Sequence, residues 1–234
     1  MVEIRGPQLV DDFSKRGVGG EEEILFCGER IGHSRKLAAG TDPVEVCDDR
    51  RMRDSEAVVT SVNRDDAHRF TKPPRDHITL LEGLGVEGDS HAGLTVQHRS
   101  RLEKHGDDPN LRQVHLIAEE LFDELAAKGY TLTPGDLGEN VTTRGVDFLG
   151  LPRETRLRLG SDAMIELTGL RNPCLQIDRF RTGLLKEVVG RDEGGNIVRR
   201  AGVMSIVLAG GRVAATDVIR VELPAEPHIP LDYV

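Results

Sequence analysis

Apolar and polar positions along the chain follow two different patterns, and the pattern changes near residue 57. Before that point, charge clusters and scattered glycines show no sustained period of 2 or 3.6. We therefore expect residues 1–56 to form an N-terminal extension of unknown role with poor order. From residue 57 onward, short β-branched and apolar runs alternate with turn residues, which predicts strands. The expected strands are 57–62, 77–81, 114–117, 141–143, 156–159, 163–168, 197–199, 203–208 and 218–223.

One stretch has the period of a helix. In AEELFDELAAKG, residues 118–129, apolar side chains recur every four positions together with Ile117, acids occupy the first turn, and Gly129 stands at the expected stop. A second, short helix is expected near 183–189. Many short strands with few helices and no alternation of strand and helix predict a mostly β, barrel-like, mainly antiparallel domain over 57–224. The tail, 225–234, contains two prolines and directly follows a third, Pro224, and it is expected to be extended.

Composition and charge limit the classes of partner. The chain has 31 Lys and Arg against 40 Asp and Glu, a net charge of −9. The overall charge therefore provides no attraction to nucleic acid or to an anionic membrane. An anion site must therefore be local. No apolar run approaches the roughly 18 residues of a membrane helix, and three scattered cysteines do not form a disulfide framework. We expect a cytoplasmic protein with reduced thiols, and we interpret Cys27 and Cys47, in the extension, as incidental.

Chemistry is concentrated in TGLRNPCLQID, residues 168–178. The predicted strand ends at Thr168, and Pro173 biases Asn172 away from helical geometry, which controls how Cys174 leaves the turn. Arg171 could hold a positive charge near the sulfur, lowering the thiol pKa and enriching the thiolate. A thiolate at a turn is a nucleophile or a soft-metal ligand. The local pattern equally allows Cys174 to be a small apolar core residue.

Three other stretches are candidate sites. In GVEGDSHAG, residues 85–93, Gly88 is expected at an unusual backbone angle, Asp89 can accept bonds from amides two residues on, and His91 could face a pocket. The segment 97–115 holds seven cationic or histidine side chains and is either an anion clamp or a solvated loop. They are His98, Arg99, Arg101, Lys104, His105, Arg112 and His115. Zinc is disfavoured because the histidines lack helical pairing.

PGDLGENVTTRG, residues 134–145, places acids beside glycines directly before a strand. Asp136 and Glu139 could do acid–base chemistry, but capping of backbone groups in a tight loop is the more ordinary interpretation. The amide of Asn140 could recognise the edge of a heterocycle from the start of the strand.

The order of these motifs, from GVEGDSHAG through RQVHLIAEE and PGDLGENVTTRGVD to RNPCLQID and AGVMSIVLAGGRVAATDVIRV, resembles the MOSC domain, named for the C-terminal part of molybdenum cofactor sulfurases. It is most similar to the small stand-alone bacterial type. The resemblance covers roughly residues 57–224. One departure is Thr216-Asp217, where the family often has Gly-Asp.

The resemblance implies a β-rich domain with a pocket for the molybdenum cofactor, an anionic pterin (molybdopterin) with dithiolene sulfurs and a phosphate. The family's cysteine, a persulfide carrier or metal ligand, falls on Cys174. We therefore expect Cys174 to be the metal ligand and, with Arg171 and Asn172, to form the catalytic group. The expected cofactor-binding residues are Asp89, His91, Arg99, His115, Asn140 and Thr168.

Three functions stay open for this pocket. The first is reduction of N-hydroxylated compounds by the bound cofactor, with an electron-donor protein as partner. The second is a sulfur carrier that receives a persulfide from a desulfurase. The chain has no room for the pyridoxal phosphate domain of the larger sulfurases, so that sulfur would come from a partner. The third is a non-catalytic module that binds the cofactor.

Overall fold

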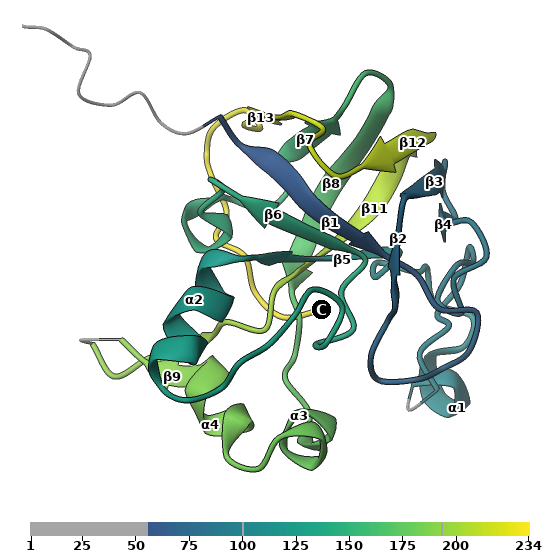
Figure 1. Cartoon of the computed structure of the whole chain (residues 1–234). Helices are drawn as coiled ribbons and strands as arrows, with labels where there is room; N and C mark the ends of the chain where they lie inside the picture. The colour runs from purple at the N-terminus through teal and green to yellow at the C-terminus, as the bar shows by residue number, and fades with distance from the viewer. Residues whose placement is uncertain (1–55, 100, 193) are drawn as a thin grey trace, which may run out of the picture. The chain divides into compact units, whose positions relative to one another are not determined.

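The computed structural model describes residues 56–99, 101–192 and 194–234 (Figure 1). Its strands are β1 (Val58–Asn63), β2 (Pro74–Arg75), β3 (His77–Leu81), β4 (Gly85–Val86), β5 (Val114–Ala118), β6 (Val141–Arg144), β7 (Arg156–Leu159), β8 (Ala163–Leu170), β9 (Val189–Arg191), β10 (Ile197–Arg199), β11 (Val203–Ala209), β12 (Gly211–Ala214) and β13 (Ile219–Glu222). Its α-helices are α1 (Leu102–His105), α2 (Glu120–Ala127), α3 (Leu175–Phe180) and α4 (Leu184–Val188), with a 3-10 turn at Phe148–Gly150.

The main sheet has eight strands in the order β13-β7-β8-β11-β5-β6-β1-β2, and two small sheets, β12-β3-β4 and β10-β9, lie outside it. The ladders are antiparallel except that of β5 with β6. The mostly β class predicted from the sequence is confirmed. Near the two ends of the sheet, Val58 and Val218 form an isolated bridge, so the sheet curls strongly without a continuous closing ladder, and no closed barrel results.

Alternation along the strands builds the first core. In β8 the residues Ala163, Ile165, Leu167 and Gly169 are buried in alternation with half-exposed neighbours, as the period of 2 requires. Ala163, Ile165 and Leu167 join apolar side chains of β1, β5, β7 and β11 in one cluster. Strand β11 lies between β8 and β5, so it brings the chain segments that follow these two strands close together.

A second core lies under the helices. Helix α2 buries Leu121, Phe122 and Leu125 on one face, and Ile177 of α3 and Leu184 of α4 pack into the same cluster. Figure 1 shows these three helices below β5. The predicted helices near 118–129 and 183–189 are confirmed, and Gly129 follows α2 with a φ of +88°. No helix among the described residues is long and apolar enough to cross a membrane.

Several elements escaped the sequence pattern. Helices α1 and α3 and the short strands β2, β4, β9 and β12 are four residues or fewer, except α3 with six, and so give almost no periodic signal. Strand β8 extends to Leu170 rather than ending at Thr168, because Leu170 still pairs with Val203 of β11. At the departure noted above, Thr216 adopts a φ of +74°, a conformation that disfavours β-branched side chains. Cys27 and Cys47 lie outside the described residues.

The final residues run beside the end of β8. The backbone N–H of Leu170 donates to Asp232 over 2.7 Å, and that of Val234 donates to Leu170 over 3.2 Å. The guanidinium of Arg199 lies 4.9 Å from the ring centre of Tyr233. The C-terminal residues are thus attached to the same strand end from which the Cys174 turn departs.

Candidate functional site

The turn of residues 171–174 connects β8 to α3. The N–H of Arg171 donates to the carbonyl of Gly202 over 2.9 Å, which holds the start of the turn against the residue directly before β11. Cys174 then adopts an extended conformation, with φ −127° and ψ 166°, as the residue before α3. It is half-buried, and its Sγ lies 3.4 Å from Oε1 of Gln176. The sulfur is therefore presented at the protein surface and is not a core filler.

Arg171 brings a positive charge to this sulfur. Its Nη1 is buried and has no hydrogen-bond partner among the described residues, and its guanidinium lies 5.8 Å from the ring centre of Phe70. Burial lowers the pKa of Arg171, while attraction to the Cys174 thiolate and to Glu139 acts in the opposite direction. A buried donor without a partner is uncommon and marks a position where an anionic group would be stabilised.

A second guanidinium faces the same region. The Nε of Arg112 is buried without a partner among the described residues, and burial, Arg101 and Arg171 lower the pKa of Arg112 to about 10. Burial together with His91, Arg112 and Arg171 lowers the pKa of His98 to about 4. Side chains from 98–112 and from the Cys174 turn therefore form a local cationic site in an acidic protein, of the kind that net charge alone could not reveal.

Asp89 is the centre of a buried hydrogen-bond network. Its Oδ2 accepts from Nζ of Lys72 over 2.7 Å, from Nδ2 of Asn140 over 3.0 Å and from the N–H of Asp65 over 3.4 Å. Its Oδ1 accepts from the N–H of His91 over 2.9 Å. Burial raises the pKa of Asp89, but the bonds from His91 and the Lys72 ammonium outweigh it, so the pKa is lowered and Asp89 is a carboxylate.

Two predictions about this turn are confirmed. Gly88 has a φ of +69°, where a Cβ would lie 2.8 Å from Nη1 of Arg64, and Asp89 accepts from the amide two residues on. The Nδ1 of His91 also lies 3.2 Å from Oδ1 of Asp89, which orients the imidazole. Its ring contacts those of His68 and His98, with centroids 5.2 and 6.0 Å away.

His115 and Asn140 are buried and fully engaged within the protein. The amide of Asn140 accepts from the N–H of His115 over 3.2 Å and donates to Asp89 and to the carbonyl of Asn63. The Nε2 of His115 lies 2.9 Å from the carbonyl of Ala201, and burial holds the pKa of His115 well below its usual value. These two side chains therefore link β5, β6 and the 200–203 segment and position the site from within.

Glu139 lies behind Arg171. It is fully buried, its Oε1 accepts from the N–H of Gly135 over 2.5 Å and from Oγ1 of Thr142 over 3.1 Å, and its Oε2 has no partner among the described residues. Burial raises its pKa. Asp136 in turn accepts from the N–H of Thr133 over 2.8 Å. The prediction that both acids cap backbone groups in a tight loop is confirmed.

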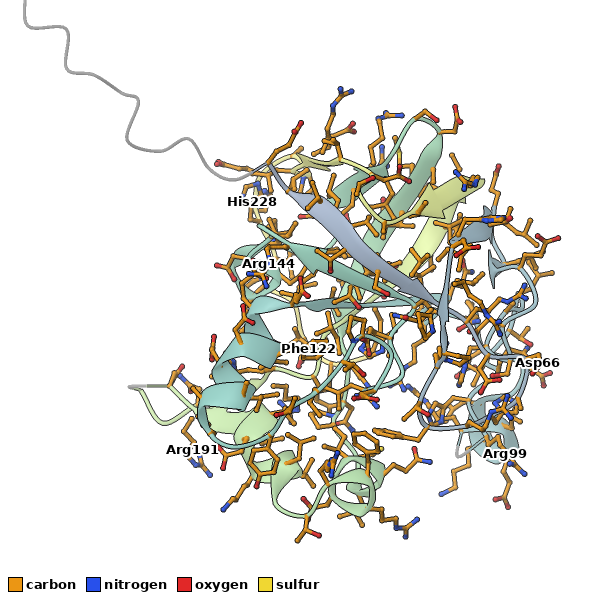
Figure 2. All side chains as sticks on the ribbon, in the orientation of Figure 1. Asp66, Arg99, Phe122, Arg144, Arg191 and His228 are labelled. Carbon is orange, nitrogen blue, oxygen red and sulfur yellow. The ribbon has the colours of Figure 1, made fainter. Side chains whose placement is uncertain are left out.

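The other predicted site residues lie around this centre. Thr168 donates its hydroxyl to the carbonyl of Leu111 over 2.6 Å, which ties β8 to the cationic loop next to Arg112. Arg99 is exposed near α1, as Figure 2 shows. Burial, His91 and the positive charge of Arg99 lower the pKa of His68. Asn172 is exposed beside Cys174. Direct cofactor contacts by these three residues stay predictions.

Sequence reasoning missed Lys72 and His68. Lys72 lies in the loop between β1 and β2 and pairs with Asp89 across 17 positions, so no local pattern links them. The sequence does contain one local signal. Lys72 follows Phe70 and Thr71 and directly precedes two prolines, so a single basic residue lies in an otherwise uncharged stretch. Among residues 56–234, leaving out 100 and 193, no group of three His, Cys, Asp or Glu side chains could hold a metal ion.

Comparison with known proteins identifies the family of this chain. The family model of the MOSC domain matches residues 101–220, which is more than half of the chain. The chain belongs to the MOSC domain family. This family is associated with binding of the molybdenum cofactor, and the matched span contains Arg112, His115, Asn140 and the Cys174 turn, whereas Lys72, Asp89 and His91 precede it.

Solved structures share the fold. The MOSC chain is similar to the YuaD protein of Bacillus subtilis, with 24% identity, a TM-score of 0.59, and coverage of 72% of this chain and 97% of that one. It is also similar to YiiM from Geobacillus stearothermophilus, with 14% identity, a TM-score of 0.49, and coverage of 74% and 77%. No curated protein matches significantly.

Proposed function

We propose that this MOSC protein binds the molybdenum cofactor at the Cys174 turn, with the Cys174 sulfur as metal ligand, and reduces N-hydroxylated compounds. One observation carries the proposal: a half-exposed thiol lies near Arg171, whose charge acts in turn on Arg112, and each arginine has a buried nitrogen without a hydrogen-bond partner among the described residues. A soft sulfur suits molybdenum, and unpartnered guanidinium nitrogens suit an anionic group.

The residues present fit the group chemically. Cys174 could supply a soft sulfur ligand to the metal of a pterin cofactor that carries dithiolene sulfurs. The phosphate and the pterin require hydrogen-bond donors and positive charge, and Arg112, Arg171 and Arg101 supply both in a loop region that is otherwise part of an acidic chain. When bound, the cofactor would supply two-electron oxygen-atom transfer.

The chain's own residues would orient reactants and move protons. Reduction of an N–OH group to N–H consumes two electrons, from an electron-donor protein, and two protons, and releases water. His91 is a candidate proton donor because Asp89 fixes its ring through Nδ1, which leaves Nε2 as the atom directed elsewhere. Arg171 would place a positive charge near the Cys174 sulfur, and the His115–Asn140 pair would hold the 200–203 segment that supports Arg171.

The test is molybdenum and pterin content, together with turnover, of wild-type protein and of Cys174→Ala, both purified from a host that makes the cofactor. We expect Cys174→Ala to lose at least about tenfold in both, since a soft-metal bond is removed. Cys27→Ala is the matched control and should change neither. Unchanged reductase activity in Cys174→Ala would refute the assignment of the sulfur.

A second function is favoured by one observation. Cys174 is half-exposed and is followed by Leu175, whose exposed fraction is 66%. An exposed apolar side chain beside a reachable thiol suits the approach of a partner protein, so a persulfide carrier loaded by a desulfurase is the alternative. Its test is an added sulfur atom on Cys174, measured by mass spectrometry after anaerobic incubation with a cysteine desulfurase. If metal binding survives in Cys174→Ser and neither activity appears, the result would instead favour a non-catalytic module that binds the cofactor.

A further inference from the structure

A cavity lies away from the Cys174 turn. It has a volume of about 370 Å³ and is bounded by the N-terminal half of α2, the loop of residues 145–149 and the segment 200–203. Neither Cys174 nor any residue of the cationic site lines it. Its size lies within the range of pockets that hold small molecules.

The four acids at the start of α2 and directly before it differ in whether a basic side chain pairs with them. Arg144, labelled at the end of β6 in Figure 2, bonds Glu119 over 3.2 Å and Asp123 over 2.9 Å, and Arg200 pairs with Glu124. Glu120 is different: its Oε1 accepts from the N–H of Gly145 over 2.7 Å, and its Oε2 is buried without a partner among the described residues. Of these four carboxylates, only that of Glu120 has no cation among the described residues.

The remainder of the cavity wall is mostly apolar. Leu121, Val146, Phe148 and Val203 line it, and Asp147 adds a further acid whose Oδ1 caps the 3-10 turn. The cavity's charges are three acids against Arg200, which Glu124 already neutralises. A buried carboxylate oxygen without a donor is costly unless a ligand supplies one. The cavity therefore combines a cation acceptor with an apolar wall.

We propose that this cavity binds a small organic cation, a primary amine or amidinium on an apolar body, with its N–H donors on the Glu120 carboxylate and its body against Phe148 and Leu121. The charge of this cavity is opposite in sign to that of the Cys174 site, so the two select different ligands. The inference does not rest on the proposed cofactor, and either can fail alone.

Calorimetric titration of the full chain with 2-phenylethylamine tests the proposal. We expect one binding site per chain, and 2-phenylethanol, which has the same apolar body without the cation, should bind at least about tenfold more weakly. Glu120→Gln keeps an acceptor for the N–H of Gly145 but removes the charge, and should weaken amine binding at least about tenfold, whereas Glu222→Gln on exposed β13 should not.

A second variant covers the case in which Glu120→Gln does not fold. Ala118→Leu adds apolar volume from the cavity wall and should abolish amine binding in a protein that stays folded by circular dichroism. The proposal is overturned if the amine does not bind at millimolar concentration, if the alcohol binds as tightly as the amine, or if either variant binds the amine as the wild type does.

Discussion

Asp89 connects several segments of the candidate site through hydrogen bonds to its buried carboxylate. It accepts hydrogen bonds from the Lys72 ammonium, from Asn140 directly before β6 and from the turn that holds His91, so three separate segments depend on one carboxylate. A buried ion pair of this kind is weak evidence for net stabilisation, but the loss of one partner leaves the other charge buried and unpaired.

Asp89→Asn should therefore destabilise the protein by about 3–5 kcal/mol, because the Lys72 ammonium would remain buried without its counter-charge. Urea unfolding followed by circular dichroism measures the loss. Adding Lys72→Met to Asp89→Asn should recover part of it. The control is Asp66→Asn, at a carboxylate that is 88% exposed, and it should change the free energy of unfolding by less than about 0.5 kcal/mol. Equal effects of the two single variants would contradict the account.

At the scale of elements, the site depends on loops that approach the sheet closely. Gly135, with φ +89°, lies in the loop before β6, and a Cβ there would lie 1.9 Å from the carbonyl of Lys72. Its own carbonyl accepts from the N–H of Lys72 over 2.9 Å, and its N–H donates to Glu139. This one glycine thus clamps the Lys72 segment to the loop that carries Glu139 and Asn140.

Gly135→Ala combines a backbone penalty with this clash, whereas Gly129→Ala, at φ +88° with no atom within 4 Å, has the backbone penalty alone. We expect Gly129→Ala to cost about 1–2 kcal/mol and Gly135→Ala at least about 2 kcal/mol more, as measured by urea unfolding. Similar losses in the two variants would mean that the Lys72 segment yields easily, and that the clamp is not a structural requirement.

For the whole molecule, buried histidines make stability depend on pH. The pKa of His98 is about 4 in the folded protein, against an ordinary value near 6.5, and burial also holds the pKa of His115 well below that value. As pH falls, the unfolded chain binds protons first. The contribution of these neutral histidines to the free energy of unfolding is therefore fully present above about pH 6.5, and it is lost as the pH falls toward 4.

The free energy of unfolding should accordingly fall between pH 7 and pH 5, and it should fall less in His98→Gln. His77→Gln, at an exposed histidine in β3, is the control and should retain the wild-type dependence. Urea titrations at both pH values measure the difference. A pH dependence that His98→Gln leaves unchanged would exclude His98 as a contributor.

What the sequence determined by itself is local. The alternation that makes β8, the four-residue spacing of α2, the capping by Asp136 and Glu139, and the bond from Asp89 to the amide of His91 each involve residues within a few positions of one another. Such features follow from backbone geometry and side-chain chemistry, which the order of residues contains directly. The motif order around Cys174 likewise indicates the MOSC family without information on the tertiary structure, and the family model confirms it.

Only the tertiary structure decided which distant groups meet. Because β11 lies between β8 and β5, Gly202 reaches Arg171, and Ala201 reaches His115. This packing also produces the pairing of Lys72 with Asp89, the two arginine nitrogens that have no partner in the described part of the chain, and the Glu120 cavity. None of these has a periodic signal in the sequence. Burial then sets their charges and pKa values, because desolvation depends on neighbours that the fold, and not local sequence, supplies.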